Sequence, residues 1–384
     1  MSKKVLIKDV CNVVTGSTPK SNVPEYWNGN IKWITPAEIN EDSFIVNDTV
    51  RHITEEGVRS TGLKSFPKGT VILSSRAPIG KVAIAGCEMY CNQGFKNIIC
   101  GIQIYNEYLY WFLKSKSEYL NSLGRGATFK EISKNIVDNI EVPLPNFEVQ
   151  IHLADTFNKI KDLENLYRGQ LVLLDQLVKS RFMELFIQNN AMFPKKKLRE
   201  CTIINPKKSM DTRLRDDLIV SFVPMASVGE DGSINTSDTK KYCEVKSGFT
   251  YFIDGDVLFA KITPCMENGK GAVATNLYNG IGFGSTEFHV VRPIEGITNP
   301  VWLYTLSVLK EFRLAAEANM TGSAGQKRTP ASFLQNYEIK LPPIDLQNQF
   351  AHFVEQVNKS KLEVQKSLEE LETLKESLMQ QYFG

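Results

Sequence analysis

The sequence has little of what marks membrane, secreted or zinc-stapled proteins. No apolar run reaches the roughly 18 residues that a membrane-spanning helix needs, and Lys3, Lys4 and Lys8 interrupt any N-terminal signal core. The seven cysteines are an odd number and none lies in a Cys-x-x-Cys pair, so neither a disulfide framework nor a zinc ribbon is indicated. We expect reduced thiols, a cytoplasmic protein and no membrane contact.

Common catalytic signatures are also missing. No G-x-x-x-x-G-K-[ST], H-E-x-x-H or G-x-S-x-G occurs, and the four histidines are scattered. Residues 280–284 imitate a dinucleotide fingerprint but run into a strand-like segment instead of opening a helix. Glu244 and Lys246, with Asp231 or Asp238 upstream, only weakly resemble the acidic pair and lysine of a Mg²⁺-dependent nuclease. We therefore expect no catalytic residue and no metal ligand.

An excess of one charge is absent as well, since the formal net charge is +2. Residues 1–143 carry 17 Lys and Arg against 14 Asp and Glu, and residues 195–340 carry 19 against 16. Residues 144–194 carry 5 against 6, and residues 341–384 carry 4 against 7. Two mildly basic blocks thus alternate with two acidic ones, a pattern that ordinary solvated surfaces also produce.

What the chain does have is an internal repeat. At an offset of 197 residues, the segment 142–186 aligns without gaps on the segment 339–383. The matched pairs include Pro145 with Pro342, Gln150 with Gln347, Leu171 with Leu368, and Leu174 with Leu371. Agreement over so many ungapped residues favours two related copies over two unrelated surface helices.

Each copy predicts a long helix that begins just after prolines. Residues 147–188 would span about 60 Å at 1.5 Å per residue, long enough for a spacer. Apolar residues follow steps of four and three, as in a coiled coil, with breaks at Glu164, Arg181, Lys361 and Lys375. We expect the helices to pair through Leu153, Phe157, Ile160, Leu171 and Leu174 of the first and Phe350, Val354, Val357, Leu368 and Leu371 of the second.

The blocks before the helices are expected to be mainly β. Short runs of Val, Ile, Phe and Tyr alternate there with Gly, Asn, Asp and Pro, and the segment 69–78 matches the segment 255–264. The predicted fold class is α+β, with β-rich modules at 1–143 and 195–341 and long helices at 144–194 and 342–384. A pseudo-two-fold repeat would lay these helices antiparallel.

The motifs resemble those of the DNA specificity subunit of type I restriction-modification systems over essentially the whole chain. In the first block the resemblance rests on Thr15-Gly-Ser-Thr-Pro19, Tyr26-Trp-Asn-Gly29, Ser74-Ser-Arg-Ala-Pro-Ile-Gly80 and Asn92-Gln-Gly-Phe95. Gly126-Ala-Thr-Phe-Lys130, leading to Val142-Pro-Leu-Pro145, resembles the end of a target recognition domain. The second block departs, with Ile204-Asn-Pro-Lys-Lys208 at its opening and Gly284-Ser-Thr-Glu-Phe288 in place of Asn-Gln-Gly-Phe.

The resemblance implies a non-catalytic subunit whose two target recognition domains read a bipartite site in double-stranded DNA. It implies as partners two methyltransferase subunits, docked along the helices, and restriction subunits that act as motor and nuclease. No cofactor is expected in this chain, and S-adenosylmethionine, ATP and Mg²⁺ are expected in the partners. The alternatives are a two-headed protein-binding scaffold and, more remotely, the metal-dependent nuclease.

Candidate DNA contacts are loop residues, because Lys, Ser and Thr suit phosphates whereas Arg, Asn and Gln read base edges. In the first block they are Thr18, Lys20, Ser75, Arg76, Lys81, Asn92, Gln93, Lys96 and Arg125. In the second they are Lys207, Lys208, Lys261, Thr263, Asn268, Lys270, Ser285, Thr286, Lys327 and Arg328. Each of them could instead be a turn residue or a solvated side chain, and Trp33 is expected in the core.

Overall fold

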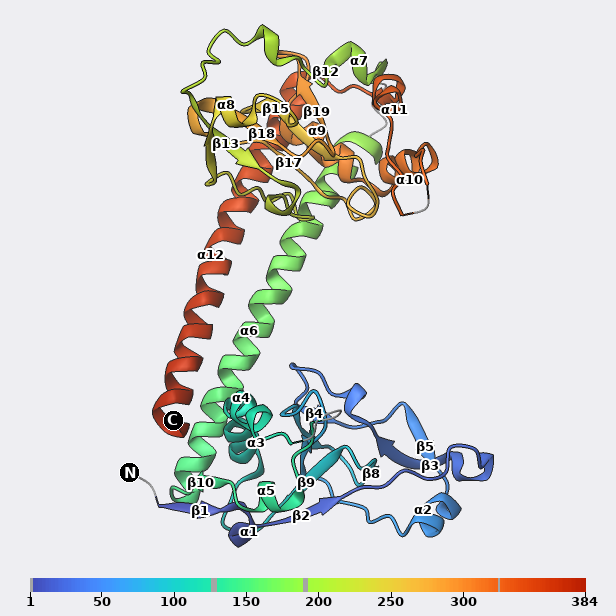
Figure 1. Cartoon of the computed structure of the whole chain (residues 1–384), viewed down its shortest axis with the longest axis vertical. Helices are drawn as coiled ribbons and strands as arrows, with labels where there is room; N and C mark the ends of the chain where they lie inside the picture. Colours follow the sequence, from blue (N-terminus) through green and yellow to red (C-terminus); the bar gives the residue numbers. More distant parts are fainter. Residues whose placement is uncertain (1–2, 126–129, 189–192, 324) are drawn as a thin grey trace. The chain divides into compact units, whose positions relative to one another are not determined.

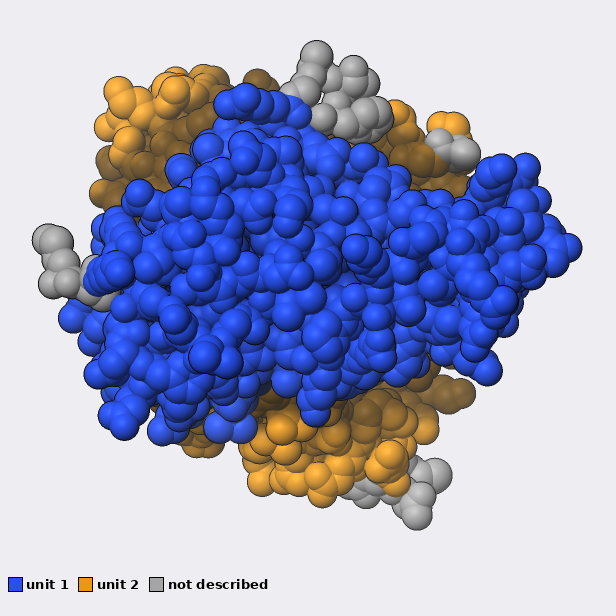
Figure 2. Space-filling view, turned by 90° about the horizontal axis from the view of Figure 1, so that it is seen from below, with its two compact units in different colours: residues 1–168, 366–384 blue, residues 169–365 orange. Residues whose placement is uncertain are grey.

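The chain folds into two compact units. The structure is a computed structural model that describes residues 3–125, 130–188, 193–323 and 325–384. Unit 1 comprises residues 1–168 and 366–384, and unit 2 comprises residues 169–365 (Figure 2). Each unit contains one β-rich head, which we call the first head (residues 3–143) and the second head (residues 195–340), together with parts of two long helices (Figure 1).

The first head is built on two sheets. One has the strand order β2 (Cys11–Thr15), β9 (Phe95–Cys100), β6 (Val71–Ser74), β7 (Val82–Ala85), β4 (Ile45–Val46), and the other the order β5 (Arg51–Ile53), β3 (Trp27–Ile34), β8 (Tyr90–Cys91). β2, β9, β6 and β7 are antiparallel neighbours, whereas β4–β7 and β3–β8 are parallel. All of β6 is buried, which explains its unbroken apolar run.

Short helices cover these sheets and complete the core. They are α1 (Ile7–Val10), α2 (Glu55–Thr61), α3 (Asn106–Ser115), α4 (Ser117–Ser122) and α5 (Lys134–Asp138), with the turns η1 (Pro24–Tyr26) and η2 (Pro36–Glu38). β1 (Lys4–Leu6) pairs with β10 (Glu141–Pro143) and joins the two ends of the head. Helix α3 buries every residue from Tyr108 to Leu113. Trp33 is also buried, as predicted, and its indole N–H donates to the Ser17 carbonyl.

The second head repeats this topology. One of its two sheets has the strand order β12 (Thr202–Ile204), β19 (Phe288–Pro293), β16 (Val257–Ala260), β17 (Gly271–Val273). The other has the order β14 (Thr239–Lys241), β13 (Ile219–Val223), β18 (Ile281–Gly284), β15 (Thr250–Ile253). The order β12-β19-β16-β17 reproduces β2-β9-β6-β7, and the parallel pair β13–β18 reproduces β3–β8. The internal repeat predicted from the sequence is therefore confirmed, although the sheet carrying β13 has gained the strand β15.

The remaining elements of the second head follow the same plan. β11 (Lys195–Lys197) pairs with β20 (Glu338–Lys340) as β1 pairs with β10. The helices are α7 (Leu198–Cys201), α8 (Tyr242–Val245), α9 (Pro300–Val308), α10 (Lys310–Ala318) and α11 (Ala331–Asn336), with the turns η4 (Lys208–Met210), η5 (Met225–Ser227) and η6 (Tyr278–Gly280). In the glycine-rich segment 280–284, residues 281–284 form β18 and open no helix, in agreement with its rejection as a dinucleotide fingerprint.

The two long helices occupy the positions that the repeat predicted. Helix α6 spans Phe147–Phe182 and continues as a π-helical segment, η3 (Met183–Gln188), while α12 spans Ile344–Phe383. Each follows a proline-containing segment, since proline suits the first turn of a helix. No helix in the described ranges combines the length and apolar character needed to cross a lipid bilayer.

A buried glutamine anchors the first turn of each long helix to its head. The Gln150 amide donates to the carbonyls of Gln103 and Pro145, both at 3.0 Å, and accepts from the Tyr105 N–H at 2.8 Å. The matching Gln347 makes the same three bonds, with Ile297, Pro342 and Asn299. Both side chains are fully buried, so the repeated glutamine holds the head and the helix start together.

Within each unit the two helices run antiparallel. In unit 1 the rings of Phe157 and Phe383 stack with centroids 5.5 Å apart, and Arg168 reaches Glu372 at 3.2 Å. In unit 2 Phe182 packs on Phe350 with centroids 5.4 Å apart. Of the ten predicted pairing residues, five are buried and five are half-buried. The buried ones are Leu153, Phe157, Ile160, Phe350 and Val357, and the half-buried ones are Leu171, Leu174, Val354, Leu368 and Leu371.

Three of the four residues that interrupt the heptad pattern, Glu164, Lys361 and Lys375, take part in ion pairs between the helices. Glu164, with a side chain only 5% exposed, pairs with Lys375 in unit 1, and Lys361 pairs with Asp175 at 2.7 Å in unit 2. A buried carboxylate is tolerated only with its partner in place, so the Glu164–Lys375 pair favours one helix register over shifted ones.

Replacing Lys375 by Met tests this role. The variant should lower the stability of the helix pair in unit 1 by about 3–5 kcal/mol, because it leaves the Glu164 carboxylate buried and unpaired. Lys361→Met is the matched control and should cost below about 1 kcal/mol, since its partner Asp175 is 51% exposed. Hydrogen exchange of the α6 amides in each unit measures both effects. Equal protection losses in the two variants, or no recovery in E164L/K375L, would contradict the assignment.

Candidate nucleic-acid interface

The two heads place equivalent residues at the ends of their central strands. Three backbone hydrogen bonds of the first head recur in the second and define the equivalence. The bond from Ser75 N to Gly94 O matches the bond from Lys261 N to Glu287 O, and the bond from Ile132 N to Ser75 O matches the bond from Thr329 N to Lys261 O. The bond from Asn92 N to Ile34 O matches the bond from Ser285 N to Val223 O. Positions 75, 94, 96 and 131 of the first head therefore correspond to positions 261, 287, 289 and 328 of the second. Both heads can then be compared residue by residue.

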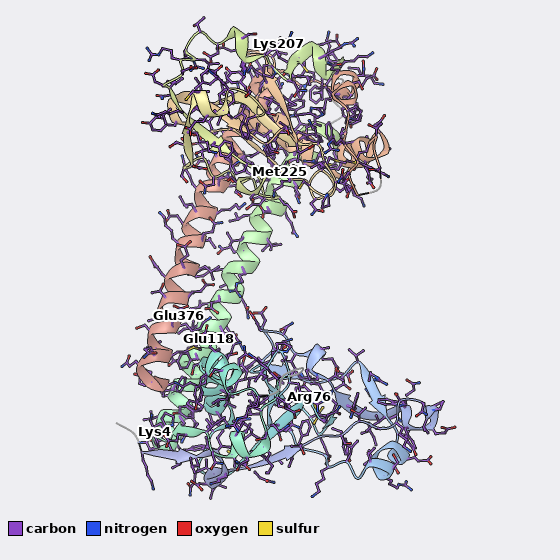
Figure 3. All side chains as sticks on the ribbon, in the orientation of Figure 1. Lys4, Arg76, Glu118, Lys207, Met225 and Glu376 are labelled. Carbon is purple, nitrogen blue, oxygen red and sulfur yellow. The ribbon has the colours of Figure 1, made fainter. Side chains whose placement is uncertain are left out.

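In the first head, the Glu131 carboxylate lies at the centre of a hydrogen-bond network that includes three of the predicted DNA contacts. Glu131 accepts from Arg76 Nε at 2.9 Å and from Lys96 Nζ at 3.1 Å, and Lys96 Nζ also donates to Ser75 Oγ at 3.1 Å. Arg125, a fourth predicted residue, exchanges two backbone hydrogen bonds of 3.0 Å with Glu131. These five residues form what we call the first cluster, in which Arg76 is labelled in Figure 3.

The charges of the first cluster are fixed by its contacts. Burial opposes ionisation of Glu131, but the hydrogen bonds from Arg76 and Lys96 outweigh it and lower the pKa of the carboxyl group. Lys96 is only 6% exposed, whereas the Arg76 side chain is 44% exposed. Only Nε of Arg76 is engaged within the described part of the chain, so its two terminal nitrogens are free to face a ligand.

In the second head the charge is reversed at one of these positions, and a carboxylate is supplied from another. Arg328 stands where the first head has Glu131, and Glu287 stands where it has Gly94. Arg328 donates two hydrogen bonds to the Glu287 carboxylate, from Nε at 2.9 Å and from Nη2 at 2.8 Å, while its Nη1 donates to the Gln326 carbonyl at 3.1 Å. The hydrogen bonds from Arg328 lower the pKa of the Glu287 carboxyl group. Together with Lys261 and His289, these two residues form what we call the second cluster.

His289 is held in its neutral form at the floor of this cluster. Its Nε2 lies 2.8 Å from the Thr329 carbonyl and must donate to it, so Nδ1 is the acceptor for the Asn205 amide at 3.1 Å. Burial lowers the pKa of the imidazole. Beside it opens a cavity of about 290 Å³ whose lining includes Lys208, Lys261 and Thr286.

Two further predicted contacts of the first head meet beside the first cluster. The Thr18 hydroxyl bonds the side chain of Gln93, and both residues are exposed. Gly16 permits this approach, because a Cβ at that position would lie 2.0 Å from the Cys91 carbonyl oxygen. The loop after β2 can therefore rest directly on the loop after β8.

Other predicted residues of the first head are engaged elsewhere. Lys81 Nζ donates to the Ile39 carbonyl at 2.7 Å, and the Asn92 side chain accepts from the Gly94 N–H at 2.9 Å. Lys20 is exposed, and its carbonyl accepts from the Trp27 indole. Most of the motif Gly126–Lys130 lies outside the described residues.

The predicted residues of the second head are more dispersed. Lys207 (labelled in Figure 3), Thr286 and Lys327 are exposed, and Lys208 Nζ donates to the Lys246 carbonyl. The remaining four lie in or beside turns. Thr263 donates its N–H to the Lys327 carbonyl, and the Asn268 side-chain amide donates to Glu230. The Lys270 N–H donates to the Cys265 carbonyl, and the Ser285 hydroxyl accepts from the Glu287 N–H.

Sequence reasoning missed the two carboxylates that organise the clusters. Glu131 and Glu287 were passed over because the candidates were chosen for attraction to phosphate, and an acidic side chain repels it. The only available signal was their position, since Glu131 follows the Gly126–Lys130 motif and Glu287 lies inside Gly284–Phe288.

The carboxylates once compared with a nuclease site serve local structure. Glu244 accepts from the Lys241 N–H at 2.8 Å at the start of α8, and Asp231 accepts from Ser233. Within the described ranges, no group of three or more His, Cys, Asp or Glu side chains is placed to hold a metal ion.

The buried His289 predicts a pH dependence for unit 2. The unfolded chain takes up a proton on this side chain as the pH falls below about 6.5, whereas the folded chain, with its lowered pKa, resists it. The stability of unit 2 should therefore fall from pH 7.5 to pH 5.5, by at most about 1.4 kcal/mol per pH unit for one proton.

Urea denaturation followed by hydrogen exchange in residues 195–340 measures this change. His289→Gln should flatten the slope, and His352→Gln, which removes an exposed histidine on α12, should leave it unchanged. An identical slope in the wild type and in His289→Gln would refute the assignment.

Comparison with known proteins agrees with this architecture. The family model for the type I restriction modification DNA specificity domain matches residues 2–172 and 184–373. Two solved chains share the fold. One comes from a study of complex assembly and conformational transition of the type I R-M system, and it has a TM-score of 0.63 and 18% identity over 99% of this chain and 97% of that one. The other is the S subunit from M. genitalium, with a TM-score of 0.55 and 13% identity over 100% of this chain and 96% of that one.

Curated relatives are similar over shorter stretches. The MjaIX specificity subunit of Methanocaldococcus jannaschii is 40% identical over 184 residues, which are 47% of this chain and 43% of that protein. The EcoAI specificity subunit of Escherichia coli is 44% identical over 146 residues, which are 38% and 24% of the two chains. The matches thus span less than half the length of these relatives. With both repeats matched by the family model and the fold shared over the whole chain, this protein belongs to the type I restriction modification DNA specificity domain family.

Proposed function

We propose that this chain is the non-catalytic DNA specificity subunit of a type I restriction-modification enzyme. Its recognition domains are residues 1–143 and 195–341, and its spacers are residues 144–194 and 342–384. The observation that carries the proposal is the charge reversal between the two clusters at one position of a repeated fold. Two copies of one scaffold with different arrangements of donors and acceptors suit two different DNA half-sites.

In the first head we assign base reading to Arg76. Its Nη1 and Nη2 atoms have no partner among the described residues, and the two nitrogens of one guanidinium edge match O6 and N7 of guanine in the major groove. Glu131 fixes the orientation of the guanidinium through Nε, while Lys96 donates both to Glu131 and to the Ser75 hydroxyl. Thr18 and Gln93 flank this group and are assigned to the neighbouring base or sugar.

In the second head the reading groups differ. All three nitrogens of Arg328 already donate within the chain, so a base contact by Arg328 would require its pair with Glu287 to open. Lys261 and Thr286, which line the cavity beside His289, are better placed to meet a base edge. Lys20, Arg125, Lys207 and Lys327 are assigned to phosphates, because their positively charged side chains are exposed. Lys81, Asn92, Lys208, Thr263, Asn268, Lys270 and Ser285 remain secondary candidates.

The long helices are proposed to dock the methyltransferase subunits. Large apolar side chains stay exposed on them, including Leu166, Val172 and Leu173 on α6 and Leu362 and Leu374 on α12, each about half exposed or more. Exposed apolar side chains gathered on one element mark a protein-binding surface. S-adenosylmethionine, ATP and Mg²⁺ would be bound by methyltransferase and restriction partners, in the cytoplasm.

A methylation map tests the function directly. Cells that express this chain with the methyltransferase encoded beside it should show methylated adenines in a bipartite motif that is absent with the methyltransferase alone. Exchanging residues 1–143 for those of a relative should change one half of the motif and leave the other. If the two proteins associate and no new motif appears, the chain is a protein-binding scaffold and the proposal fails.

Arg76→Ala tests the base contact. Loss of a bidentate contact to guanine should cost about 1–3 kcal/mol in DNA binding and relax specificity at one base pair. The matched control is Arg59→Ala, which removes an arginine of the same head that pairs with Glu55 on the exposed face of α2. Titrations of the assembled methyltransferase on matched and single-mismatch duplexes give both quantities. A uniform loss across all duplexes would assign Arg76 to phosphate, and unchanged affinity would remove it from the interface.

A further inference from the structure

Two cysteines face each other across neighbouring strands of the first head. Cys11, the first residue of β2, is the register partner of Cys100, the last residue of β9. The Gly101 N–H donates to the Val10 carbonyl at 2.8 Å just outside this pair. That bond makes Cys11 and Cys100 a pair of the non-hydrogen-bonded kind, with Cα atoms about 4.5 Å apart. Disulfides require a Cα separation of about 4.4–6.8 Å, so the backbone already holds the two thiols within bonding range.

The pair is also reachable from solvent. Cys11 and Cys100 are half-buried, and both line an open cavity of about 440 Å³ together with residues 8–10 and 101–103. The other five cysteines are placed differently. Cys91 and Cys201 are buried, Cys87 bonds the Asn47 carbonyl, and neither Cys243 nor Cys265 has a cysteine as its register partner in the described strand pairs.

The surroundings give the two thiols different roles. The neighbouring Cys100 thiol and the polar Gly101 N–H lower the pKa of Cys11, against the opposing effect of burial. Donation to Cys11 and burial raise the pKa of Cys100. Cys11 is therefore the sulfur that ionises first, and the thiolate is the reactive form of cysteine.

We propose that Cys11 and Cys100 form a reversible thiol–disulfide site that reacts with low-molecular-weight disulfides. The Cys11 thiolate attacks one sulfur of the small disulfide, which breaks its S–S bond, forms a mixed disulfide on Cys11 and releases one thiolate. Cys100 then gives up its proton and attacks the Cys11 sulfur, which forms the Cys11–Cys100 bond and releases the second thiolate. The two protein thiols lose two electrons and two protons, and the small disulfide becomes two thiols.

The link would tie together the strands that carry the first cluster. β2 and β9 pair from Cys11 with Cys100 at one end to Thr15 with Lys96 at the other. Closing the chain between residues 11 and 100 restricts the opening of this strand pair. Oxidation should therefore slow amide exchange in β2 and β9, and reduction should reverse it. The chemistry stands apart from the proposed DNA function and is measured without DNA.

Peptide mapping of the full chain tests the site. The reduced protein is incubated with oxidised glutathione, the remaining thiols are alkylated, and tryptic peptides are weighed. The expected product joins residues 9–20 to residues 97–114, is two hydrogen atoms lighter than the separate peptides, and disappears with dithiothreitol. Cys87 and Cys91 fall in a different peptide, residues 82–96, so the assignment is unambiguous.

Single variants separate the two roles. Cys100→Ser should accumulate glutathione on Cys11, and Cys11→Ser should lose the link and leave Cys100 alkylated. Cys243→Ser, which removes an exposed cysteine, should keep the link at the wild-type level. Full alkylation of both Cys11 and Cys100 in the wild type, or glutathione on each without a link between them, would overturn the proposal. So would a link that persists in a large excess of reduced glutathione, because the site would then be permanent and not reversible.

Discussion

The attachment of each head to its long helix depends on one buried amide. Gln150 and Gln347 each satisfy two carbonyls and one N–H at the point where a loop of the head meets the first helical turn. A buried polar group that lost these partners would cost free energy without any compensating contact with water, so the side chain, the loop and the helix start are held as one piece. The same arrangement in both copies makes the head and its helix the repeating element.

The repeat keeps the framework and varies the chemistry at one position. Backbone hydrogen bonds place Ser75 on Lys261 and Gly94 on Glu287, yet the carboxylate of the first cluster comes from a different segment than that of the second. The acid Glu131 of the first head is replaced by the base Arg328 in the second, and each head keeps an ion pair because its partner comes from a different position. Among the described residues, two nitrogens of Arg76 have no partner, whereas Arg328 uses all three on its own chain. The proposed reading of two unlike half-sites requires this combination of constant backbone and variable side chains.

In the long helices, the spacing of residues along the sequence predicts the helices themselves but not the long-range contacts between them. Their bounds, their start after proline and their apolar seam follow from spacing alone, because a helix brings residues three and four apart to one face whatever surrounds it. Glu164 and Lys375 appear in the sequence as defects of that seam. In the structure they form a pair across 211 residues of chain, and no local pattern contains that information. The partners of Glu131 and Glu287 likewise lie 35 to 55 residues away, so no local pattern shows that these two acidic side chains organise the clusters.

The sequence by itself determined the internal repeat, the two helices, the β-rich heads and the resemblance to DNA specificity subunits, because all of these depend on periodicity and order along the chain. Only the tertiary structure decided which of the candidate side chains meet, which of them are occupied by internal partners, and that Cys11 faces Cys100 across β2 and β9. The physical reason is that hydrogen bonds, ion pairs and thiol pairs depend on distances of a few ångströms. Strand pairing and burial set those distances between residues that are far apart in sequence.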